Sequence, residues 1–316
     1  MNAPRTTAVA LDLPFAVYDA FTSVPYSGSQ GASVLDAAAI DAKLRARIAV
    51  EIGAPATAFV DTWADNRIKL QFFSTIAEQP MCGHGTVCLI TRMVDAGLIS
   101  CPPEGTGTAI LELPNGNAQV EFHRNEAGRL VVMLDVAIAA IEPAMLDFDR
   151  LGDLLSVTRA DFAYDLPIQV ARADFIHLCL PMRNLAAMAR LRPNFDALAQ
   201  FCRANKIETV AAFSMEVEQP GMTLHIRDFC PAVGVAESAG AGTTNAAVAA
   251  YLLHNGRVTP DATGQAVVWA EQGIELSRPS NVITRATVED GSIKRLQVGG
   301  IATKVIEGHL NVVLGQ

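Results

Sequence analysis

The chain has 316 residues, of which 50% are hydrophobic and only 18% are charged. This length exceeds the usual size of a single core, so two domains are expected, and the composition excludes a disordered protein. The formal net charge is −9 and no cluster of Lys and Arg is present, which argues against a nucleic-acid partner. No apolar run of about 18 residues could span a membrane, and acidic residues interrupt the first thirty positions, unlike a signal peptide. We therefore expect a cytoplasmic protein with no membrane partner.

In the first half, alternating apolar residues predict strands at 15–21, 58–61 and 68–73, and helical spacing predicts a helix at 41–52. A glycine-containing loop at 79–85 then leads into a helix at 86–96. This helix is apolar on nearly every face, which is typical of a helix enclosed by other elements.

The second half follows a similar plan. Strands are predicted at 130–136, 176–180 and 222–229, and a helix at 194–204. The loop 231–242 leads into another helix, 243–254, that is again apolar nearly all round. The last stretches, 266–276, 293–298 and 302–314, predict strands and hairpins.

A short motif occurs once in each half. Cys82-Gly83-His84-Gly85-Thr86 aligns with Ala239-Gly240-Ala241-Gly242-Thr243 at an offset of 157, and Glu78 and Glu237 precede the two motifs. The duplication predicts a pseudo-symmetric α+β protein. We place an N-terminal domain at residues 1–126 and a C-terminal domain at residues 127–316, whose last strands can pack back on the first domain.

A Gly-x-Gly-Thr loop at the start of a helix suits an anion. Glycines let the backbone approach a ligand closely, and the first N–H groups of a helix lack partners within the helix. These groups and the helix dipole favour a carboxylate or a developing oxyanion. One such loop alone would be explained as a tight turn, whereas two matched loops favour a site for a small carboxylate. The predicted binding residues in these loops are Gly83, Gly85, Thr86, Gly240, Ala241, Gly242 and Thr243.

Cys82 and His84 are the candidate catalytic residues of the first loop. A thiol at a helix N-terminus is expected to have a lowered pKa, and a thiol of that kind can remove and return a carbon-bound proton. His84 is a candidate general acid or base, or a residue that orients the substrate carboxylate. Of the six cysteines, Cys230 is a minor candidate, and the absence of any CxxC pair argues against a zinc ribbon.

With these motifs assembled, the chain resembles the PhzF-like isomerases of phenazine biosynthesis, within the superfamily of diaminopimelate epimerase and proline racemase. The resemblance implies two domains, each with a curved sheet around a central helix, and an active site between them. It also implies that no metal or organic cofactor is needed, and it implies a homodimer. The matching segments are Tyr18-Asp19-Ala20-Phe21-Thr22, Thr57-Ala58-Phe59-Val60, Met81-Cys82-Gly83-His84-Gly85-Thr86, Leu191-Arg192-Pro193-Asn194-Phe195, Arg227-Asp228-Phe229-Cys230-Pro231, Gly234-Val235-Ala236-Glu237, Tyr251-Leu252 and Glu271-Gln272-Gly273.

The sequence departs from that family at the positions that carry chemistry. Ala56 stands where the family has a proton-shuttling Glu, and Ser238 stands where it has an Asp after Glu237. Gly28-Ser29-Gln30 replaces a substrate-contacting Gly-Asn-Pro. The related epimerases use a second cysteine, and the motif alignment puts Ala239 there. We therefore expect Cys82 to act as a single base with His84, Ser238 to be a third catalytic candidate, and Glu237, Ser29 and Gln30 to contact the substrate.

Three functions remain open at this stage. The first is a cofactor-independent isomerase that shifts a proton, and with it a double bond, on a small carboxylate. The second is a dehydratase-like or racemase-like enzyme acting on an amino or hydroxy acid. The third is a catalytically silent binding protein that kept the loops and lost the acid–base pair.

Overall fold

The protein is described here by a computed structural model, which covers residues 9–314. Backbone contacts divide the chain into two compact units. The first contains the chain up to Tyr26, residues 30–132 and the chain from Ile301 onward, and the second contains residues 27–29 and 133–300. The division in the middle of the chain therefore falls inside β8 (Leu130–Asp135), and the last strand belongs to the first unit.

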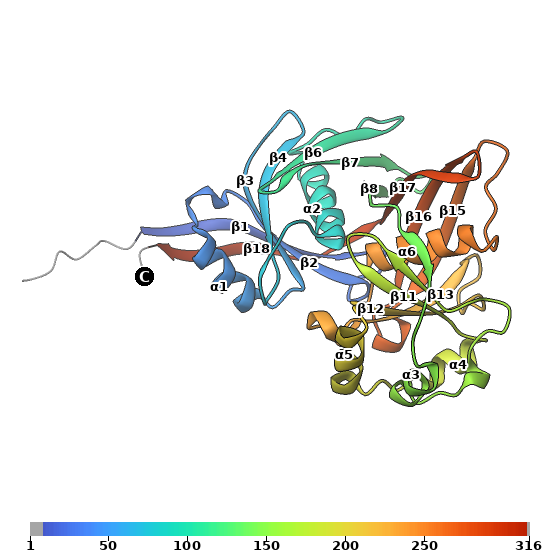
Figure 1. Ribbon diagram of the computed structural model, residues 1–316. Helices are drawn as coiled ribbons and strands as arrows, with labels where there is room; N and C mark the ends of the chain where they lie inside the picture. Colours follow the sequence, from blue (N-terminus) through green and yellow to red (C-terminus); the bar gives the residue numbers. More distant parts are fainter. Residues whose placement is uncertain (1–8, 315–316) are drawn as a thin grey trace, which may run out of the picture. The chain divides into compact units, whose positions relative to one another are not determined.

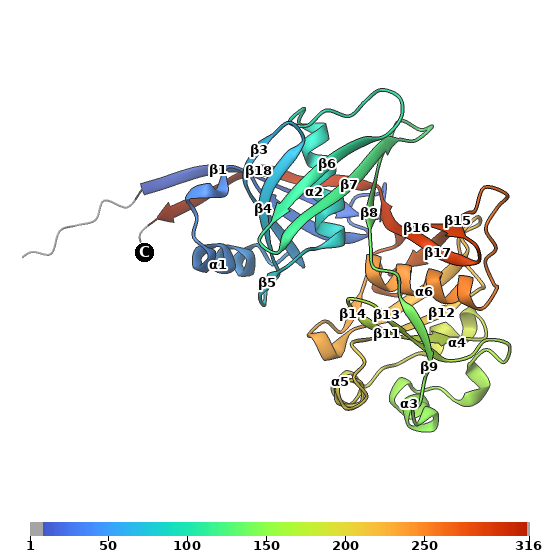
Figure 2. The same cartoon turned by 45° about the horizontal axis from the view of Figure 1, so that its top comes forward.

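The first unit surrounds one central helix with strands (Figures 1 and 2). Its long outer strands, β1 and β18, run antiparallel over twelve residue pairs, from Val9↔Leu314 to Ala20↔Ala302. Its elements are β1 (Val9–Ala20), β2 (Ser29–Val34), α1 (Ala42–Ile52), β3 (Ala56–Ala64), β4 (Arg67–Phe73), β5 (Glu78–Gln79), α2 (Gly83–Asp95), β6 (Gly107–Leu113), β7 (Gly116–Arg124) and β18 (Ala302–Leu314).

The second unit also encloses a central helix, α6, and adds α3 and α5 on its outside (Figure 2). A separate hydrophobic cluster that includes Leu151, Leu155, Leu198 and Cys202 fills the space beneath these outer helices. Its elements are β9 (Ala140–Pro143), α3 (Phe148–Leu155), β10 (Gln169–Arg172), β11 (Ile176–Pro181), α4 (Leu185–Arg190), α5 (Phe195–Ala204), β12 (Thr209–Ser214), β13 (Leu224–Phe229), β14 (Glu237–Ser238), α6 (Gly242–His254), β15 (Gln265–Gln272), β16 (Ser280–Glu289) and β17 (Ser292–Gly300).

Strand pairing repeats between the units. In the first, β2 is parallel to β3, β3 is antiparallel to β4, and β4 pairs with both β5 and the parallel strand β6. In the second, β11 is parallel to β12, β12 is antiparallel to β13, and β13 pairs with both β14 and the parallel strand β15. The predicted α+β fold of two similar halves is thus confirmed.

The two central helices are buried on nearly all faces, as their composition predicts. Both have 13 residues. Every residue of α2 from Gly85 to Val94 is buried, as is every residue of α6 from Thr244 to Leu252. A helix that is apolar all round has no solvent face to offer, so the surrounding strands stabilise it chiefly by burying its side chains.

The structure corrects the offset between the two halves. Both ends of the central helices, Gly83 with Gly242 and Asp95 with His254, are 159 positions apart, and β5 and β14 begin with the same spacing. The motif alignment at 157 was therefore wrong by two residues. Cys82 corresponds to Ala241, the residue before α6, rather than to Ala239.

Several element boundaries also differ from prediction. The strand expected at 266–276 ends at Gln272, because Gly273 turns the chain with φ 76° into a short 3-10 turn. The strand expected at 15–21 ends one residue earlier, where Phe21 adopts φ 64°. Several elements were not predicted, among them the strands β2, β6, β7, β10, β12 and β16 and the helices α3 and α4.

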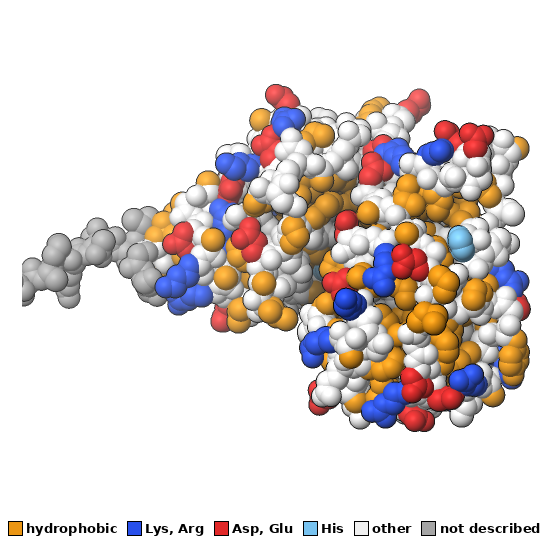
Figure 3. Space-filling view, viewed as in Figure 1, with side chains coloured by type: hydrophobic (Ala, Val, Ile, Leu, Met, Phe, Trp, Pro, Cys, Tyr) orange, Lys and Arg blue, Asp and Glu red, His pale blue; other side chains and the backbone are white. Residues whose placement is uncertain are grey.

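The surface is mixed. On the face seen in Figure 3, acidic and basic side chains are interspersed with apolar ones and no single sign covers the second unit. Within the described residues, no helix is long and apolar enough to cross a membrane.

Candidate functional site

The first loop places Cys82 at the start of α2. Its backbone is extended (φ −137°, ψ 115°), and its carbonyl accepts hydrogen bonds from the backbone N–H of Thr86 at 2.9 Å and from the Thr86 hydroxyl at 2.8 Å. The Cys82 side chain does not cap the helix. Instead its Sγ lies 3.5 Å from Nδ1 and 3.7 Å from Nε2 of His84, so the sequence-predicted pair is in contact.

The expected low pKa of Cys82 is wrong. Burial raises the pKa of this thiol to about 12, and hydrogen bonding to the backbone at Gly85 and His84 lowers it only in part. The residue is 7% exposed, so the cost of desolvating a thiolate exceeds the effect of the helix end. Burial also lowers the pKa of the half-buried His84 to about 4. At neutral pH the pair is a thiol beside a neutral imidazole.

Gly85 is the tightly packed glycine of this loop. A Cβ on Gly85 would lie 3.0 Å from the Phe72 ring, 3.2 Å from Cβ of Ala56 and 3.3 Å from Sγ of Cys82. A Cβ on Gly83 would meet nothing within 4 Å. The small residue at 85 therefore sets the position of the thiol, and Ala56 fills the space beside it without supplying a proton-transfer group.

Ser238 lies on β14, directly opposite Asp228 of β13 in the antiparallel register. The loop that follows is held by hydrogen bonds from buried side chains. Gln272 donates to the Ser238 carbonyl at 2.8 Å and accepts from the Ala241 backbone N–H at 3.3 Å. Ser280 donates to the Ala239 carbonyl at 2.6 Å.

The start of α6 repeats the geometry of the start of α2. Ala241 has φ −129° and ψ 114°, and its carbonyl accepts from the backbone and side chain of Asn245, as that of Cys82 accepts from Thr86. Thr243, which corresponds to His84, is exposed. The backbone conformation at the start of α6 thus matches that at the start of α2, but Ala241 has no thiol at the position of Cys82.

The other predicted contacts are placed as follows. Ser29 is buried and Gln30 is half-buried at the start of β2. The carbonyls of Ser27 and Gly28, just before them, accept hydrogen bonds from Arg278 at 2.8 Å each, and these three residues all belong to the second unit. Both carboxylate oxygens of Glu237 accept from Arg227, at 2.8 and 2.9 Å, so this residue is held in a buried ion pair.

Sequence reasoning missed three residues around the candidate site: Gln272 and Asp228, which hold or pair with the second loop and its strand β14, and Arg278, which bonds to the segment before Ser29. Gln272 and Asp228 lie in segments that carried the family resemblance, but nothing in their spacing indicated that they contact the loop. Arg278 had no sequence signal. Within residues 9–314 no group of three or more His, Cys, Asp and Glu side chains is arranged to hold a metal ion.

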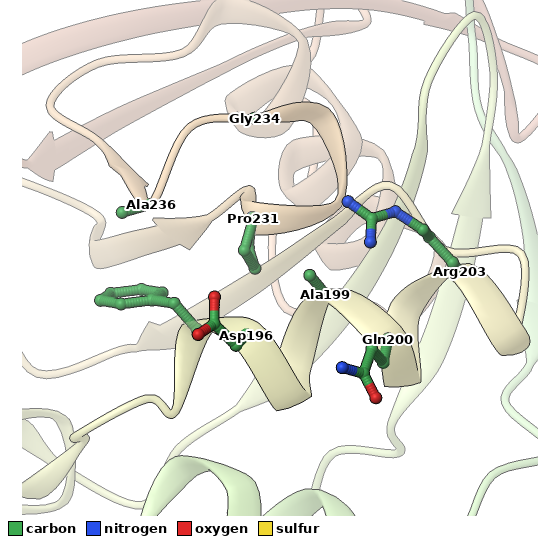
Figure 4. Close-up of a pocket in the computed structure, with 8 residues that line it drawn as sticks. Asp196, Ala199, Gln200, Arg203, Pro231, Gly234 and Ala236 are labelled. Atoms are coloured by element: carbon green, nitrogen blue, oxygen red, sulfur yellow. The ribbon is translucent and has the colours of Figure 1, made fainter.

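A cavity of about 430 Å³ lies between α5 and the segment that leads to β14 (Figure 4). Its lining residues are Phe195, Asp196, Ala199, Gln200, Arg203, Pro231, Gly234 and Ala236. Arg203 points toward the Gly234 segment and Gln200 points away from it. This cavity contains none of the sequence-predicted site residues.

Comparison with known proteins assigns the chain to a family. Residues 18–308 match the PhzC-PhzF model of phenazine biosynthesis-like proteins. The chain belongs to this family. Among curated relatives, an uncharacterized isomerase, YddE, of Escherichia coli K12 is 26% identical over 90% of this chain and 93% of its own length. The trans-2,3-dihydro-3-hydroxyanthranilate isomerase of Pseudomonas chlororaphis is also 26% identical, over 90% of this chain and 95% of its own.

Solved structures support the same fold. A PhzF-family protein of Bacillus anthracis aligns with a TM-score of 0.85 and 23% identity, covering 96% of this chain and all of that one (100%). A hydroxyproline epimerase of Agrobacterium vitis aligns with a TM-score of 0.62 and 13% identity, over 96% and 93% of the two chains. The resemblance inferred from the motifs is confirmed.

Proposed function

We propose that the protein is a cofactor-independent isomerase that moves a proton on a small carboxylate, with Cys82 as the base. The enzyme class follows from the family, whose curated relatives are named isomerases. The observation that carries the finer proposal is the contact of 3.5 Å between the Cys82 thiol and the imidazole of His84 at the start of a buried helix.

The raised pKa of Cys82 has to be reconciled with this role. At neutral pH the thiol has to pass its proton to His84, and burial opposes both charges of the resulting thiolate and imidazolium. Attraction between the two charges across the 3.5 Å contact offsets part of this cost.

Binding would use the helix start. The N–H groups of Gly83 and Gly85 lie in the first turn of α2 and would stabilise a carboxylate or an enolate-like oxygen, whereas the N–H of Thr86 already donates to the Cys82 carbonyl. The equivalent groups of Gly242 and Thr243 lie in the first turn of α6. Each oxyanion donor of this kind typically contributes about 10²–10³ in rate.

The reaction would be a 1,3-proton shift. Cys82 Sγ would take a proton from the carbon next to the carboxylate, the electron pair would remain as an enolate, and a proton would be delivered at the next carbon but one. A racemase with two facing thiols is disfavoured, because Ala241 occupies the position equivalent to Cys82.

A catalytically silent binding protein is the second candidate. It is favoured by the protonated resting state of Cys82 and by the absence of a carboxylate at Ala56. The two candidates differ in whether any substrate carbon exchanges its proton with solvent.

The test is proton NMR of small unsaturated, hydroxy and amino acids in D₂O, with the wild-type chain and Cys82→Ser. Deuterium incorporation that the variant loses supports the isomerase, and water loss would instead indicate a dehydratase. Cys101→Ser, at a half-buried cysteine away from the helix start, is the matched control and should keep the exchange. If thermal shift detects binding but no compound of the panel shows exchange, the protein is the catalytically silent binding protein.

A homodimer and a cytoplasmic location stay predictions. Light scattering tests the first.

A further inference from the structure

Four equivalent positions beneath the two helix starts differ sharply between the units. In the first unit they are Gly31, Ala56, Phe72 and Gly85, and we call them the first inner cluster. Gly31 pairs with Ala56 across β2 and β3, and a Cβ on Gly85 would touch both Ala56 and Phe72. The first inner cluster is therefore made only of small or apolar groups.

The second inner cluster is polar. Its residues are His177, Thr209, Asp228 and Thr244. The strand register makes His177 and Thr209, which pair across β11 and β12, equivalent to Gly31 and Ala56. In the same way, the position of Asp228 on β13 is equivalent to that of Phe72 on β4. Thr244 is the third residue of α6, as Gly85 is of α2. All four side chains are buried.

Hydrogen bonds connect the second inner cluster. His177 Nδ1 lies 2.7 Å from the Thr209 hydroxyl and 3.5 Å from that of Thr244. The Thr244 hydroxyl donates to Oδ2 of Asp228 at 2.9 Å. Asp228 is 1% exposed, and its other oxygen, Oδ1, has no hydrogen-bond partner in the part of the chain that the structure describes.

The fold itself does not require this polarity. The first unit fills the equivalent space with a phenylalanine and three small residues, so an apolar solution is compatible with the same strands and helix. A buried carboxyl with an unsatisfied oxygen lowers the stability of the folded chain. A costly group that the other copy of the fold does without points to a role in function.

Asp228 is also next to the candidate catalytic serine. It is directly opposite Ser238 in the antiparallel pair of β13 and β14. Residues paired in this way project to the same face, with Cβ atoms about 4.5–5.5 Å apart. Oδ1 of Asp228 is therefore within reach of the Ser238 hydroxyl after rotation of these two short side chains.

We propose that Asp228 is the proton-donating partner of Ser238, so that the second loop carries a serine–carboxyl pair that delivers a proton to the substrate. This inference rests on the proposed function, and both residues of the pair lie in the second unit. Asp228 acts through Ser238 and is a positioning residue in this sense.

The step balances as two coupled proton transfers. The Ser238 O–H bond breaks as its proton bonds to the enolate carbon, whose electron pair forms the new C–H bond. The Asp228 Oδ1–H bond breaks as that proton bonds to Ser238 Oγ, and Asp228 is left as a carboxylate. A proton from water restores Asp228, and His84 releases to water the proton that it took from Cys82 at the start.

Groups around Asp228 are consistent with a carboxyl that holds a proton. Burial raises the pKa of Asp228 to about 6, hydrogen bonds lower it in part, and the charge of a nearby carboxylate raises it again. His177 is neutral at that pH, since burial lowers its pKa to about 4. The donors that lower the pKa of Asp228 are Cys230, Thr244 and Thr209, and the carboxylate is Glu237, which is paired with Arg227.

The first experiment needs no substrate. In the full chain with ¹³C-labelled aspartate carboxyls, we expect one carboxyl to titrate near pH 6, to vanish in Asp228→Asn and to change its midpoint in Ser238→Ala. Asp161→Asn, at a carboxyl 8% exposed, is the matched control and should leave that midpoint unchanged. A midpoint that Ser238→Ala does not move would overturn the inference.

The second experiment separates removal of a proton from its delivery. With a substrate found in the D₂O panel, Asp228→Asn and Ser238→Ala should each keep deuterium exchange next to the carboxylate and lose delivery at the distant carbon by about 10²-fold or more. The double variant should be no slower than the slower single one, and wild-type delivery should fall above pH 6.

The outcomes distinguish the two proposals. No exchange by the wild-type chain at any carbon contradicts the proposed function and leaves the titration to decide the pairing of Asp228 with Ser238. Equal loss of exchange and delivery, or no loss of either, contradicts the inference alone. If Asp228→Asn does not fold, Ser238→Ala carries both tests.

Discussion

The Cys82 thiol and the His84 imidazole lie 3.5 Å apart, yet burial keeps both uncharged. A solvent-exposed helix N-terminus lowers the pKa of a thiol beside it. At a buried helix N-terminus the thiolate also loses its hydration, and at Cys82 this desolvation has the larger effect on the pKa. Under the proposed function, the thiolate–imidazolium form of this pair would arise when a bound substrate changes the balance.

Alkylation of Cys82 tests this balance. With a pKa of about 12, the thiolate fraction at pH 7.5 is roughly 10³-fold below that of an ordinary cysteine, so iodoacetamide should modify Cys82 that much more slowly. Peptide mass spectrometry of the folded and the urea-unfolded chain measures the ratio. Fast labelling at pH 6 would show that the helix end dominates after all.

Gly85→Ala tests how the thiol is positioned. The added methyl meets the Phe72 ring at 3.0 Å and Sγ of Cys82 at 3.3 Å, so we expect a loss of about 1–3 kcal/mol in stability and a larger loss of exchange activity. Gly83→Ala, with nothing within 4 Å, should change neither by much. Equal effects of the two substitutions in urea unfolding would argue against steric control by position 85.

At the scale of elements, the second loop depends on one side chain from β15. Gln272 is completely buried and bonds to the Ser238 carbonyl, the Ala241 N–H and the Asn245 side chain. Gln272→Ala leaves these groups without their partner, and we expect a loss of about 2–4 kcal/mol, since each unsatisfied buried group costs about 1–3 kcal/mol. Gln265→Ala, at an exposed position of the same strand, is the control for urea unfolding and should cost under about 0.5 kcal/mol.

The elements also show what the sequence could predict. The enclosed helices α2 and α6 were predictable because apolar residues on every face leave no other arrangement. The strand β12 was not, since its six buried residues give no alternation that would distinguish a strand from a helix. The offset between the two halves was misjudged because the Gly-x-Gly-Thr letters match best at 157. The hydrogen bonds that the carbonyls of Cys82 and Ala241 accept at the two helix starts show that these two residues are equivalent, which gives an offset of 159.

Within the candidate site, the contact between Cys82 and His84 was predictable, because the two residues lie two positions apart in a loop. The pairing of Asp228 with Ser238 was not. Asp228 and Ser238 are ten positions apart and meet only through the pairing of β13 with β14. A contact that depends on strand register has no signal in the local sequence.

For the whole molecule, duplication allows one half to specialise. The same pairing of strands carries an apolar cluster and a thiol in one unit, and a polar cluster without a thiol in the other. The fold tolerates both, because the same strand pairing and the same buried central helix occur in each unit. The difference between the copies is therefore better explained by chemistry than by packing.

Specialisation has a consequence for the pH dependence of stability. Burial lowers the pKa of His177 to about 4, while an unfolded histidine titrates near 6.5. Between these values the unfolded chain binds a proton that the folded chain does not, so stability falls as the pH drops from about 6.5 to about 4. For His177 the loss amounts to about 3 kcal/mol, from about 2.5 pKa units.

His177→Gln should remove this part of the acid loss. We expect the variant to be less stable than wild type at pH 7.5, because the bond to Thr209 is altered, but to lose about 3 kcal/mol less between pH 6.5 and pH 4. Urea unfolding across this range measures the difference. His309→Gln, at a side chain 60% exposed, should keep the wild-type slope. If stability falls equally with pH in wild type and His177→Gln, then His177 takes up a proton in the folded chain as readily as in the unfolded chain. The second inner cluster would then hold a buried charge on His177, which contradicts the neutral state expected from burial.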